Sequence, residues 1–330
     1  DLANHTAAGG DAEGDTLISI ENIAGSAYGD VMHGDAAGNR LQGMAGNDAL
    51  YGADGVDRLI GGEGADILDG GAGIDTADYS TALAGLVVSL LAPASNTGDA
   101  AGDSFTSIEN LSGSDFGDTL TGDGNVNRIS GLSGNDVIYG MGGNDTLVGG
   151  EGADTLDGGA GTDTADYSTA AAGVTVNMLS PLANTGDAAG DILIAIENVA
   201  GSDFADTITG DDNANRLSGV DGNDVLDGKG GIDYLVGGAG DDTLTGGAGA
   251  DVFVYNPGFG HDTITDFWAG LTRTDRVQLI GTELTTFAAV QSALTQTVDG
   301  ALLTLNGGAD TILFAGLSVT ALVADDFVFA

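Results

Sequence analysis

Residues 61–69 read Gly-Gly-Glu-Gly-Ala-Asp-Ile-Leu-Asp, and this nine-residue pattern decides the fold. Residues 140–148 read Gly-Met-Gly-Gly-Asn-Asp-Thr-Leu-Val, and residues 237–245 read Gly-Gly-Ala-Gly-Asp-Asp-Thr-Leu-Thr. Each copy has glycines among its first four positions, an aspartate at the sixth and an apolar residue at the eighth. A short period of this kind indicates a repeat fold in which every copy packs against its neighbours.

The nonapeptide occurs eighteen times, in three sets of six. Its registers open at 25, 34, 43, 52, 61 and 70, then from 113 to 158, and then from 201 to 246. A longer period of 88 residues contains these sets, because Gly-Ile-Asp-Thr-Ala-Asp-Tyr-Ser-Thr-Ala at 73–82 returns with one change at 161–170. Spacers of 34 residues therefore separate the sets.

The two periods predict how the chain is organised. The predicted segments are a partial spacer at 1–24, β-roll block 1 at 25–78, a spacer at 79–112, block 2 at 113–166, a spacer at 167–200, block 3 at 201–254 and a C-terminal β-rich cap at 255–330. The chain begins in mid-repeat, so we expect it to be a piece of a longer protein. The aromatic residues after 253 suit a cap, because the end of a solenoid has to be closed.

The apolar eighth position predicts the core. In the first set it is Met32, Leu41, Leu50, Leu59, Leu68 and Ala77. The three residues around it suit a very short strand, while the glycine-rich six suit a turn that needs residues without a Cβ. We therefore expect an all-β fold, a parallel β-roll (β-solenoid) in which two nonapeptides make one coil.

Composition limits the partners. The chain has 50 acidic and 7 basic residues, and its net charge of -43 makes a compact chain repel itself. Nucleic acids and anionic membranes need basic patches, so we predict neither partner. No apolar run is long enough for direct membrane insertion. With no cysteine, any staple has to be oxygen-based.

The sixth position supplies such a staple. Calcium takes six to eight oxygen ligands, from carboxylates and main-chain carbonyls, and the turn offers both. Coils eighteen residues apart should bring two half-sites face to face. The predicted calcium ligands are Asp48, Asp57, Asp66, Asp75, Asp136, Asp145, Asp154, Asp163, Asp224, Asp233, Asp242 and Asp251. If neighbours on one side share an ion, the three blocks hold roughly a dozen.

Some positions depart from the pattern. In the second turn of every set an Asn-Arg pair replaces the aspartate and its neighbour, at 39–40, 127–128 and 215–216. We expect a weaker calcium site there or none. One coil earlier the sixth position is a glutamate, such as Glu109. Its pair with the arginine either replaces an ion or is an exposed ion pair worth at most about 1 kcal/mol. In the spacers, we interpret Tyr79 as a buried anchor; the alternative is that the whole spacer is a contact surface. Whether residues 98–103 form another calcium loop is not decided by the sequence.

Catalysis is not predicted, and we expect the chain not to be an enzyme. His5, His33 and His261 lack the spacing of a zinc protease, and no nucleophile elbow or phosphate-binding loop is present. A calcium-bound carboxylate is also a poor proton carrier. We interpret Trp268 and its aromatic neighbours as core residues of the cap. The alternative of a flexible acidic linker does not explain the fixed register of aspartate and apolar residues.

These motifs resemble the repeats-in-toxin (RTX) family, also called haemolysin-type repeats. The resemblance covers residues 25–254 by nonapeptide and 251–330 by the Asp-Thr-Ile-Thr-Asp-Phe at 262–267 and the closing Asp-Asp-Phe-Val-Phe-Ala. It implies a Ca²⁺-binding parallel β-roll, secreted by a Gram-negative bacterium through type I secretion machinery that reads an uncleaved C-terminal signal. It also implies an extracellular or cell-surface location.

Two functions remain open from the sequence. The first is a secreted structural or interaction protein, self-associating as a surface layer, filament or adhesin-like array that folds on binding extracellular Ca²⁺. The second is the C-terminal secretion and folding module of an exported hydrolase or polysaccharide-modifying enzyme whose catalytic domain precedes residue 1. In both, calcium binding free energy becomes folding free energy.

Overall fold

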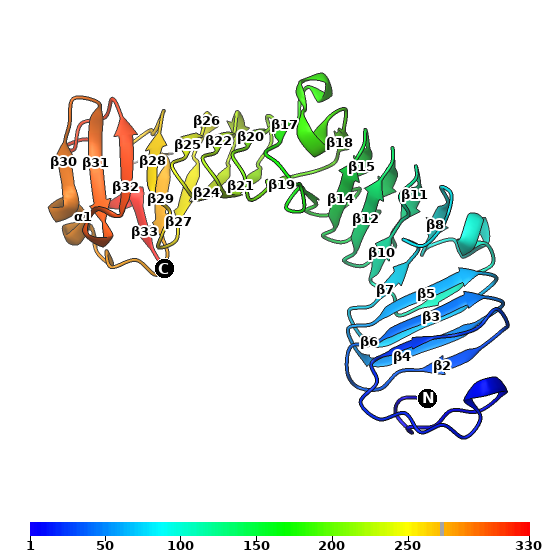
Figure 1. Cartoon of the computed structure of the whole chain (residues 1–330). Helices are drawn as coiled ribbons and strands as arrows, with labels where there is room; N and C mark the ends of the chain where they lie inside the picture. Colours follow the sequence, from blue (N-terminus) through cyan, green and yellow to red (C-terminus); the bar gives the residue numbers. More distant parts are fainter. Residues whose placement is uncertain (271–273) are drawn as a thin grey trace. The chain divides into compact units, whose positions relative to one another are not determined.

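The computed structural model describes residues 1–270 and 274–330, and they form two compact units, Asp1–Asp163 and Thr164–Ala330. In both units short strands succeed one another in parallel along the chain (Figure 1). The fold is the predicted all-β parallel β-roll, with spacers between repeat blocks and a β-rich C-terminal cap. Among the described residues, no helix has the length and apolar character needed to cross a membrane.

In the first unit one parallel ladder carries a strand from every second nonapeptide. Its strands are β1 (Asn22–Ala24), β3 (Arg40–Ala45), β5 (Arg58–Glu63), β7 (Thr76–Asp78), β10 (Asn110–Ser112), β12 (Arg128–Ser133) and β14 (Thr146–Glu151). Leu41 pairs with Leu59 eighteen residues on, whereas Ala77 pairs with Leu111 across the spacer. The spacer thus takes the place of one coil, and this ladder of strands continues through it.

The intervening nonapeptides form the opposite face of the first unit. Their strands are β2 (Val31–His33), β4 (Ala49–Gly55), β6 (Ile67–Gly73) and β9 (Ser104–Thr106), followed by β8 (Val87–Ser89), β11 (Thr119–Thr121), β13 (Val137–Tyr139) and β15 (Thr155–Asp157). This face is divided at the spacer, because β6 pairs with β9 whereas β11 pairs with β8. The spacer therefore starts a new set of coils on this side.

The second unit repeats the arrangement. One ladder comprises β16 (Thr164–Asp166), β19 (Asn198–Ala200), β21 (Arg216–Asp221), β24 (Tyr234–Ala239), β27 (Val252–Tyr255), β29 (Arg276–Leu279) and β33 (Phe327–Phe329). The other comprises β17 (Thr175–Asn177), β20 (Thr207–Thr209), β22 (Val225–Asp227), β25 (Thr243–Thr245), β28 (His261–Ile264), β32 (Asp310–Ala315), β31 (Gly300–Leu305) and β30 (Leu294–Gln296). Smaller elements are β18 (Ile192–Ile194), β23 (Gly230–Gly231) and β26 (Ala248–Gly249).

The C-terminal residues close the second roll. The parallel ladder ends at β28 and β32, and β31 and β30 then continue it antiparallel. The α-helix α1 (Phe287–Ala293) begins at Thr286, whose side chain accepts the Ala289 N–H. The described 3₁₀ turns are η1 (Gly10–Ala12), η2 (Pro93–Ser95), η3 (Gly98–Ala100), η4 (Pro181–Ala183), η5 (Gly186–Ala188), η6 (Asn306–Gly308) and η7 (Ala324–Asp326).

Aromatic rings pack inside the cap, where Phe267 contacts Phe253 and Phe314, with centroids 6.0 and 5.0 Å apart. Trp268 was wrongly assigned to this core, because 61% of it is exposed. Trp268 directly follows the buried Phe267, but its own side chain faces solvent.

The core of each roll is the predicted row of eighth-position side chains. All eighteen are buried, namely Met32, Leu41, Leu50, Leu59, Leu68, Ala77, Leu120, Ile129, Ile138, Leu147, Leu156, Ala165, Ile208, Leu217, Leu226, Leu235, Leu244 and Phe253. One such residue per nonapeptide makes a narrow core, so the turns have to contribute much of the stability.

Glycine is required in the turns because successive coils approach through their backbones. Gly64 has φ +151°, and a Cβ there would lie 1.6 Å from the carbonyl oxygen of Gly46, one coil earlier. No side chain fits this position without moving the coils apart. The glycines therefore set the spacing at which the sixth-position aspartates meet.

Candidate calcium sites between the coils

The sixth-position residues form ladders of their own along the roll. The N–H of Asp48 donates to Oδ1 of Asp66 over 2.8 Å, and the N–H of Asp57 donates to Oδ1 of Asp75 over 2.8 Å. The same bond joins Asp30 to Asp48, Asn39 to Asp57, Asp118 to Asp136, Asn127 to Asp145, Asp136 to Asp154, Asp145 to Asp163, Asp206 to Asp224, Asn215 to Asp233, Asp224 to Asp242 and Asp233 to Asp251. One oxygen of each carboxylate is thereby fixed to the coil before it.

All twelve predicted calcium ligands lie in these ladders, and none is more than 2% exposed. In nine of them the second oxygen, Oδ2, is buried without a hydrogen-bond partner: Asp48, Asp57, Asp66, Asp75, Asp145, Asp224, Asp233, Asp242 and Asp251. A buried carboxylate oxygen left in this state costs several kcal/mol unless a cation neutralises it. The repeated orphan oxygen is therefore the feature that a bound cation explains.

The glycine at the first position of each turn provides the space beside this oxygen. At Gly43 a Cβ would collide with Oδ2 of Asp48 and would lie 2.6 Å from the carbonyl oxygen of Gly61, one coil later. At Gly52 the corresponding carbonyl oxygen belongs to Gly70, at 2.5 Å. A carboxylate oxygen and a carbonyl oxygen from successive coils thus converge where the glycine lacks a side chain. This donor set fits Ca²⁺, which takes both kinds of oxygen in flexible geometry.

Side chains alone do not make these sites. In residues 1–270 and 274–330 no group of three or more His, Asp or Glu side chains is arranged to hold a metal ion. Gaps such as those at Gly43 and Gly52 instead combine a carboxylate with a main-chain oxygen. Such a mixture suits calcium and differs from the compact side-chain clusters that bind zinc.

Burial acts directly on the carboxylates when no cation is bound. It raises the pKa of Asp66 to about 7, with the charges of Asp103 and Asp48 adding to the effect. Burial likewise raises the pKa of Asp224 and Asp233 to about 7, and of Asp145 and Asp242 to about 6. Burial therefore makes the ionised form of these aspartates unfavourable near neutral pH, and a bound divalent cation stabilises that ionised form.

The first turn of each set is closed by a serine. Oδ2 of Asp118 accepts the N–H of Ser114 over 2.6 Å and its hydroxyl over 3.1 Å. Ser202 donates in the same way to Asp206, and Ser26 to Asp30. These carboxylates have protein partners where the nine aspartates named above have an orphan oxygen. Asp30, Asp118 and Asp206 were not among the predicted calcium ligands.

The second turn of each set is closed by its asparagine. The side-chain oxygen of Asn127 accepts the N–H of Asp123 over 2.8 Å, and its amide donates to the carbonyl of Glu109 over 2.9 Å. Asn39 and Asn215 accept the equivalent N–H groups of Asp35 and Asp211. Without a carboxylate, these turns offer no charged oxygen to a cation, and the weaker calcium site expected there stays a prediction.

Glu109 takes the place of a ladder aspartate at the end of block 1. Its Oε2 accepts the N–H of Asp75 over 2.8 Å. The carbonyl oxygen of Ser107 lies beside Gly70, since a Cβ on Gly70 would be 2.2 Å from this oxygen. The pairing of such glutamates with the arginine of the next coil stays a prediction.

In the spacers a tyrosine closes the ladder. Oδ1 of Asp103 accepts the N–H of Asp66, and its Oδ2 accepts the hydroxyl of the buried Tyr79 over 2.7 Å. Tyr167 donates to Asp191 over 2.9 Å in the second spacer. Tyr79 is thus the predicted anchor. Both oxygens of Asp103 are used within the protein, which argues against the calcium loop left open at residues 98–103.

Sequence reasoning missed the ladder places of Asp103, Asp262 and Asp275, and Asp262 is the most informative of them. Its Oδ1 accepts the N–H of Asp242 over 3.0 Å, and its Oδ2 is buried without a hydrogen-bond partner. Residues 257–265, Pro-Gly-Phe-Gly-His-Asp-Thr-Ile-Thr, are a further nonapeptide whose eighth residue, Ile264, is buried. Its register opens two residues later than the period of nine requires, so strict counting from 246 passes over it.

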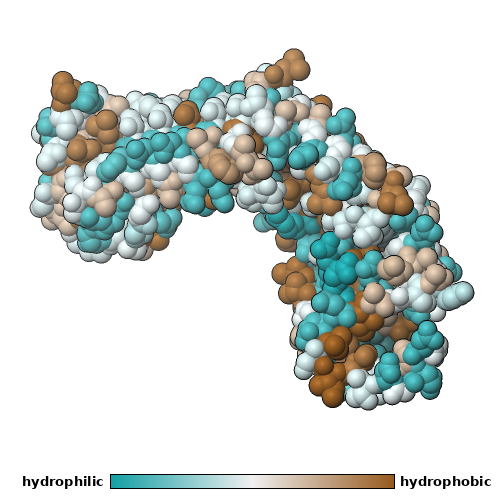
Figure 2. Space-filling model, viewed as in Figure 1, coloured by the Kyte–Doolittle hydropathy of each residue, from teal (hydrophilic) through white to brown (hydrophobic). Residues whose placement is uncertain are grey.

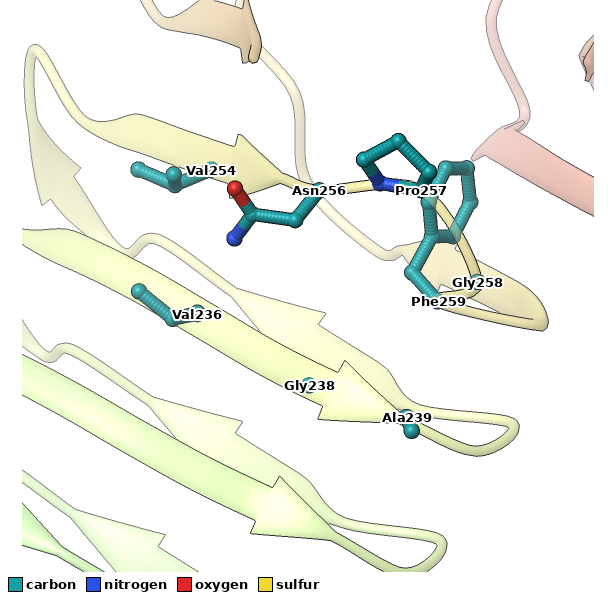
Figure 3. Close-up of a pocket in the computed structure, with 8 residues that line it drawn as sticks. All are labelled: Val236, Gly238, Ala239, Val254, Asn256, Pro257, Gly258 and Phe259. Atoms are coloured by element: carbon teal, nitrogen blue, oxygen red, sulfur yellow. The ribbon is translucent and has the colours of Figure 1, made fainter. Parts of the chain in front are cut away.

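No described feature resembles a catalytic centre. His5, His33 and His261 are exposed; the His33 ring stacks on Tyr51, and His261 contacts the Thr311 hydroxyl. A hollow of about 200 Å³ beside the cap is lined by Val236, Gly238, Ala239, Val254, Asn256, Pro257, Gly258 and Phe259 (Figure 3). This lining contains no acid, base or nucleophile.

Comparison with known proteins agrees with the geometry. The model of the RTX calcium-binding nonapeptide repeat matches residues 24–59, 43–77, 105–138, 130–165, 195–226 and 227–264, more than half of the chain. No curated protein sequence matches the chain significantly.

Two solved structures are similar over part of their length. One is the extracellular lipase LipA from Serratia marcescens, at 20% identity and a TM-score of 0.29, covering 65% of this chain and 40% of the lipase. The other is the AlgE6R3 subunit of the Azotobacter vinelandii mannuronan C5-epimerase, at 29% identity and a TM-score of 0.30, covering 38% of this chain and 79% of that subunit. The chain thus spans about 40% of the lipase. By its matched repeats, its β-roll and its ladders of buried aspartates, this chain belongs to the RTX calcium-binding nonapeptide repeat family.

Proposed function

We propose that this chain is a secreted, extracellular structural or interaction protein whose rolls fold as several calcium ions fill the gaps between coils. The observation that carries the proposal is the row of buried carboxylate oxygens without partners beside glycine carbonyls. Without cations the chain carries a net charge of -43 and keeps these carboxylates apart. With about a dozen calcium ions, more than half of that charge is neutralised.

Calcium supplies positive charge and binds oxygen ligands. The chain supplies the hydrogen bonds that hold successive coils in register. Each ladder N–H fixes the orientation of the carboxylate on the next coil before a cation is bound. Binding free energy then stabilises the stacked form over the extended one. A calcium-poor cytosol would keep the chain open for export by type I secretion machinery, and the medium outside would fold it.

An exposed aromatic residue recurs with the long period, which supports an interaction role. Tyr28, Phe116 and Phe204 lie 88 residues apart and are 79%, 45% and 48% exposed. Figure 2 shows apolar residues as separate brown groups among hydrophilic ones on the visible face. Regularly spaced apolar contacts suit self-association into a surface layer, filament or adhesin-like array.

The calcium mechanism is tested by far-ultraviolet circular dichroism during a calcium titration of a sample stripped with EDTA, with magnesium as the control. We expect a cooperative gain of β signal with calcium alone, because magnesium demands a smaller octahedral site and keeps its water. A flat response to calcium, whether the stripped chain is already folded or stays disordered, contradicts the mechanism.

The array is tested separately by sedimentation velocity of the calcium-loaded chain and of a variant in which Tyr28, Phe116 and Phe204 are replaced by serine. Concentration-dependent association that the triple variant lacks supports the array. A calcium-loaded monomer at all concentrations overturns it and favours a folding and secretion module of a longer exported enzyme.

A further inference from the structure

A tyrosine recurs at the same place after each of the three blocks. Tyr79, Tyr167 and Tyr255 lie 88 residues apart. In the first two copies the hydroxyl donates to a buried carboxylate, over 2.7 Å to Asp103 and 2.9 Å to Asp191. The third copy stands where the roll meets the cap, and it differs.

The carboxylate that corresponds to Asp103 at this junction is Asp262. Asp103 accepts the N–H of Asp66, and Asp262 accepts the N–H of Asp242. Asp66 and Asp242 are equivalent residues two long periods apart. The two carboxylates therefore hold the same place in the ladder, one at a spacer and the other at the cap.

The tyrosine and the carboxylate are not hydrogen-bonded at the cap. Tyr255 and Asp262 are each 1% exposed, and both the Tyr255 hydroxyl and Oδ2 of Asp262 lack a hydrogen-bond partner. Burial raises the pKa of the Tyr255 hydroxyl well above its usual range, and the charges of Asp262 and Asp242 raise it further. The hydroxyl thus lies within electrostatic reach of both carboxylates and bonds to neither.

The loop from Asn256 to Phe259, seen in Figure 3, fixes the arrangement. The Phe259 ring packs on Tyr255, with centroids 4.6 Å apart. Asp310 accepts the N–H groups of Gly258 and Gly260 over 3.0 and 3.2 Å. Asp262 follows Tyr255 by seven positions, whereas Asp103 follows Tyr79 by 24 positions in the spacer. These contacts fix the loop, and the Phe259 ring fixes the side chain of Tyr255 with its unpartnered hydroxyl.

The gap between Asp242 and Asp262 has the same empty side-chain position as the repeats. At Gly237 a Cβ would collide with Oδ2 of Asp242, as it would with Oδ2 of Asp48 at Gly43. The coils are also close, because a Cβ at Gly260 would lie 2.1 Å from the Gly240 carbonyl oxygen. Three buried oxygens without a hydrogen-bond partner therefore belong to this junction, namely Oδ2 of Asp242, Oδ2 of Asp262 and the hydroxyl of Tyr255.

We propose that this gap is a further calcium site, formed by Asp242, Asp262 and the hydroxyl of Tyr255, and that it fixes the cap to the roll. The proposal rests on the proposed calcium function and adds a residue type that the repeat itself does not use. The same tyrosine has two roles: in the spacers it occupies one carboxylate oxygen by a hydrogen bond, whereas at the cap its free hydroxyl completes a site.

The test counts bound calcium in the full chain by equilibrium dialysis and atomic absorption. We expect Asp262→Asn to lose one ion and Asp103→Asn to lose none, because Tyr79 already occupies the free oxygen of Asp103. Asp57→Asn is the reference within the ordinary repeats. If Asp57→Asn lowers the count and Asp262→Asn does not, this inference is overturned and the proposed function stands. If neither lowers the count, the proposed function fails as well.

Terbium luminescence tests the tyrosine independently of any loss of folding at Asp262. Terbium replaces calcium and emits when a tyrosine close to the bound ion is excited, because the excitation energy passes to the ion. We expect Tyr255→Phe to reduce this emission several-fold and Tyr79→Phe to leave it nearly unchanged. Equal emission from the Tyr255→Phe variant and the unaltered chain would show that the hydroxyl is not a ligand and would overturn the proposal.

Discussion

A ladder aspartate does two jobs with its two oxygens. Oδ1 of Asp57 accepts the N–H of Asn39 over 2.7 Å, which fixes the side chain, and Oδ2 is left for a cation. The asparagine of a second turn uses its side chain differently. The oxygen of Asn127 accepts an N–H of its own turn, and its amide donates to the carbonyl of Glu109 in the preceding coil. The asparagine therefore still joins two coils, but it offers no charged oxygen to a cation.

We predict that Asp57→Asn loses one bound calcium ion while the roll still forms. At a calcium concentration about 100-fold above the dissociation constant, the loss removes about 2.7 kcal/mol of stability. Chemical denaturation in calcium, together with calcium counting, measures both effects.

Asp30→Asn is the matched control, because Ser26 already donates to Oδ2 of Asp30. It should leave the calcium count unchanged. An equal loss of calcium in both variants would show that ladder position, rather than the orphan oxygen, decides where ions bind.

The sequence predicts residues well where the period holds. The sixth and eighth positions are fixed by counting, and the structure buries every one of the twelve aspartates and eighteen apolar residues that counting selects. Prediction from the period fails where the chain shifts register. Asp103 enters the ladder after an inserted spacer and Asp262 after a two-residue shift, and only the backbone hydrogen bonds reveal their places.

At the level of turns, each 88-residue unit alternates two kinds of closure. The spacer and the first two turns are closed by Tyr79, Ser114 and Asn127 through hydrogen bonds within the protein. In the four turns that follow, the sixth position is a buried ladder aspartate, and Asp145 among them keeps an oxygen without a hydrogen-bond partner. Stability should therefore vary along the chain with the same long period as the sequence.

We predict that partial removal of calcium loosens the ladder turns first. Amides of residues 137–157 should lose protection against hydrogen exchange before those of residues 110–121, which lie in the spacer end and the serine-closed turn. Hydrogen exchange with mass spectrometry across a series of buffered calcium concentrations measures the order. Loss of protection in both segments at one calcium concentration would mean that the roll melts as a single unit.

For the whole molecule, the raised pKa values make acid a partial substitute for calcium. Burial raises the pKa of Asp66 to about 7 and of Asp262 to about 8, above the ordinary range of an unfolded chain. The calcium-free fold therefore binds protons as it forms. Its stability from these groups is fully present below about pH 4 and is lost as the pH rises through 6 to 8.

We predict that the EDTA-stripped chain shows more β signal near pH 5 than at pH 8, by circular dichroism at low protein concentration. With calcium present the dependence should reverse, because protons compete with the cation for the carboxylates. The same β signal at both pH values in EDTA would contradict the prediction.

Every ladder bond described above runs one way, from an N–H of an earlier coil to a carboxylate of a later one. A stack of coils is therefore polar, with donors and acceptors pointing in fixed directions along its axis. Two copies that met through like ends would oppose donor to donor or carboxylate to carboxylate. Any assembly that extends these ladders from copy to copy has to grow head to tail, with one end that differs chemically from the other.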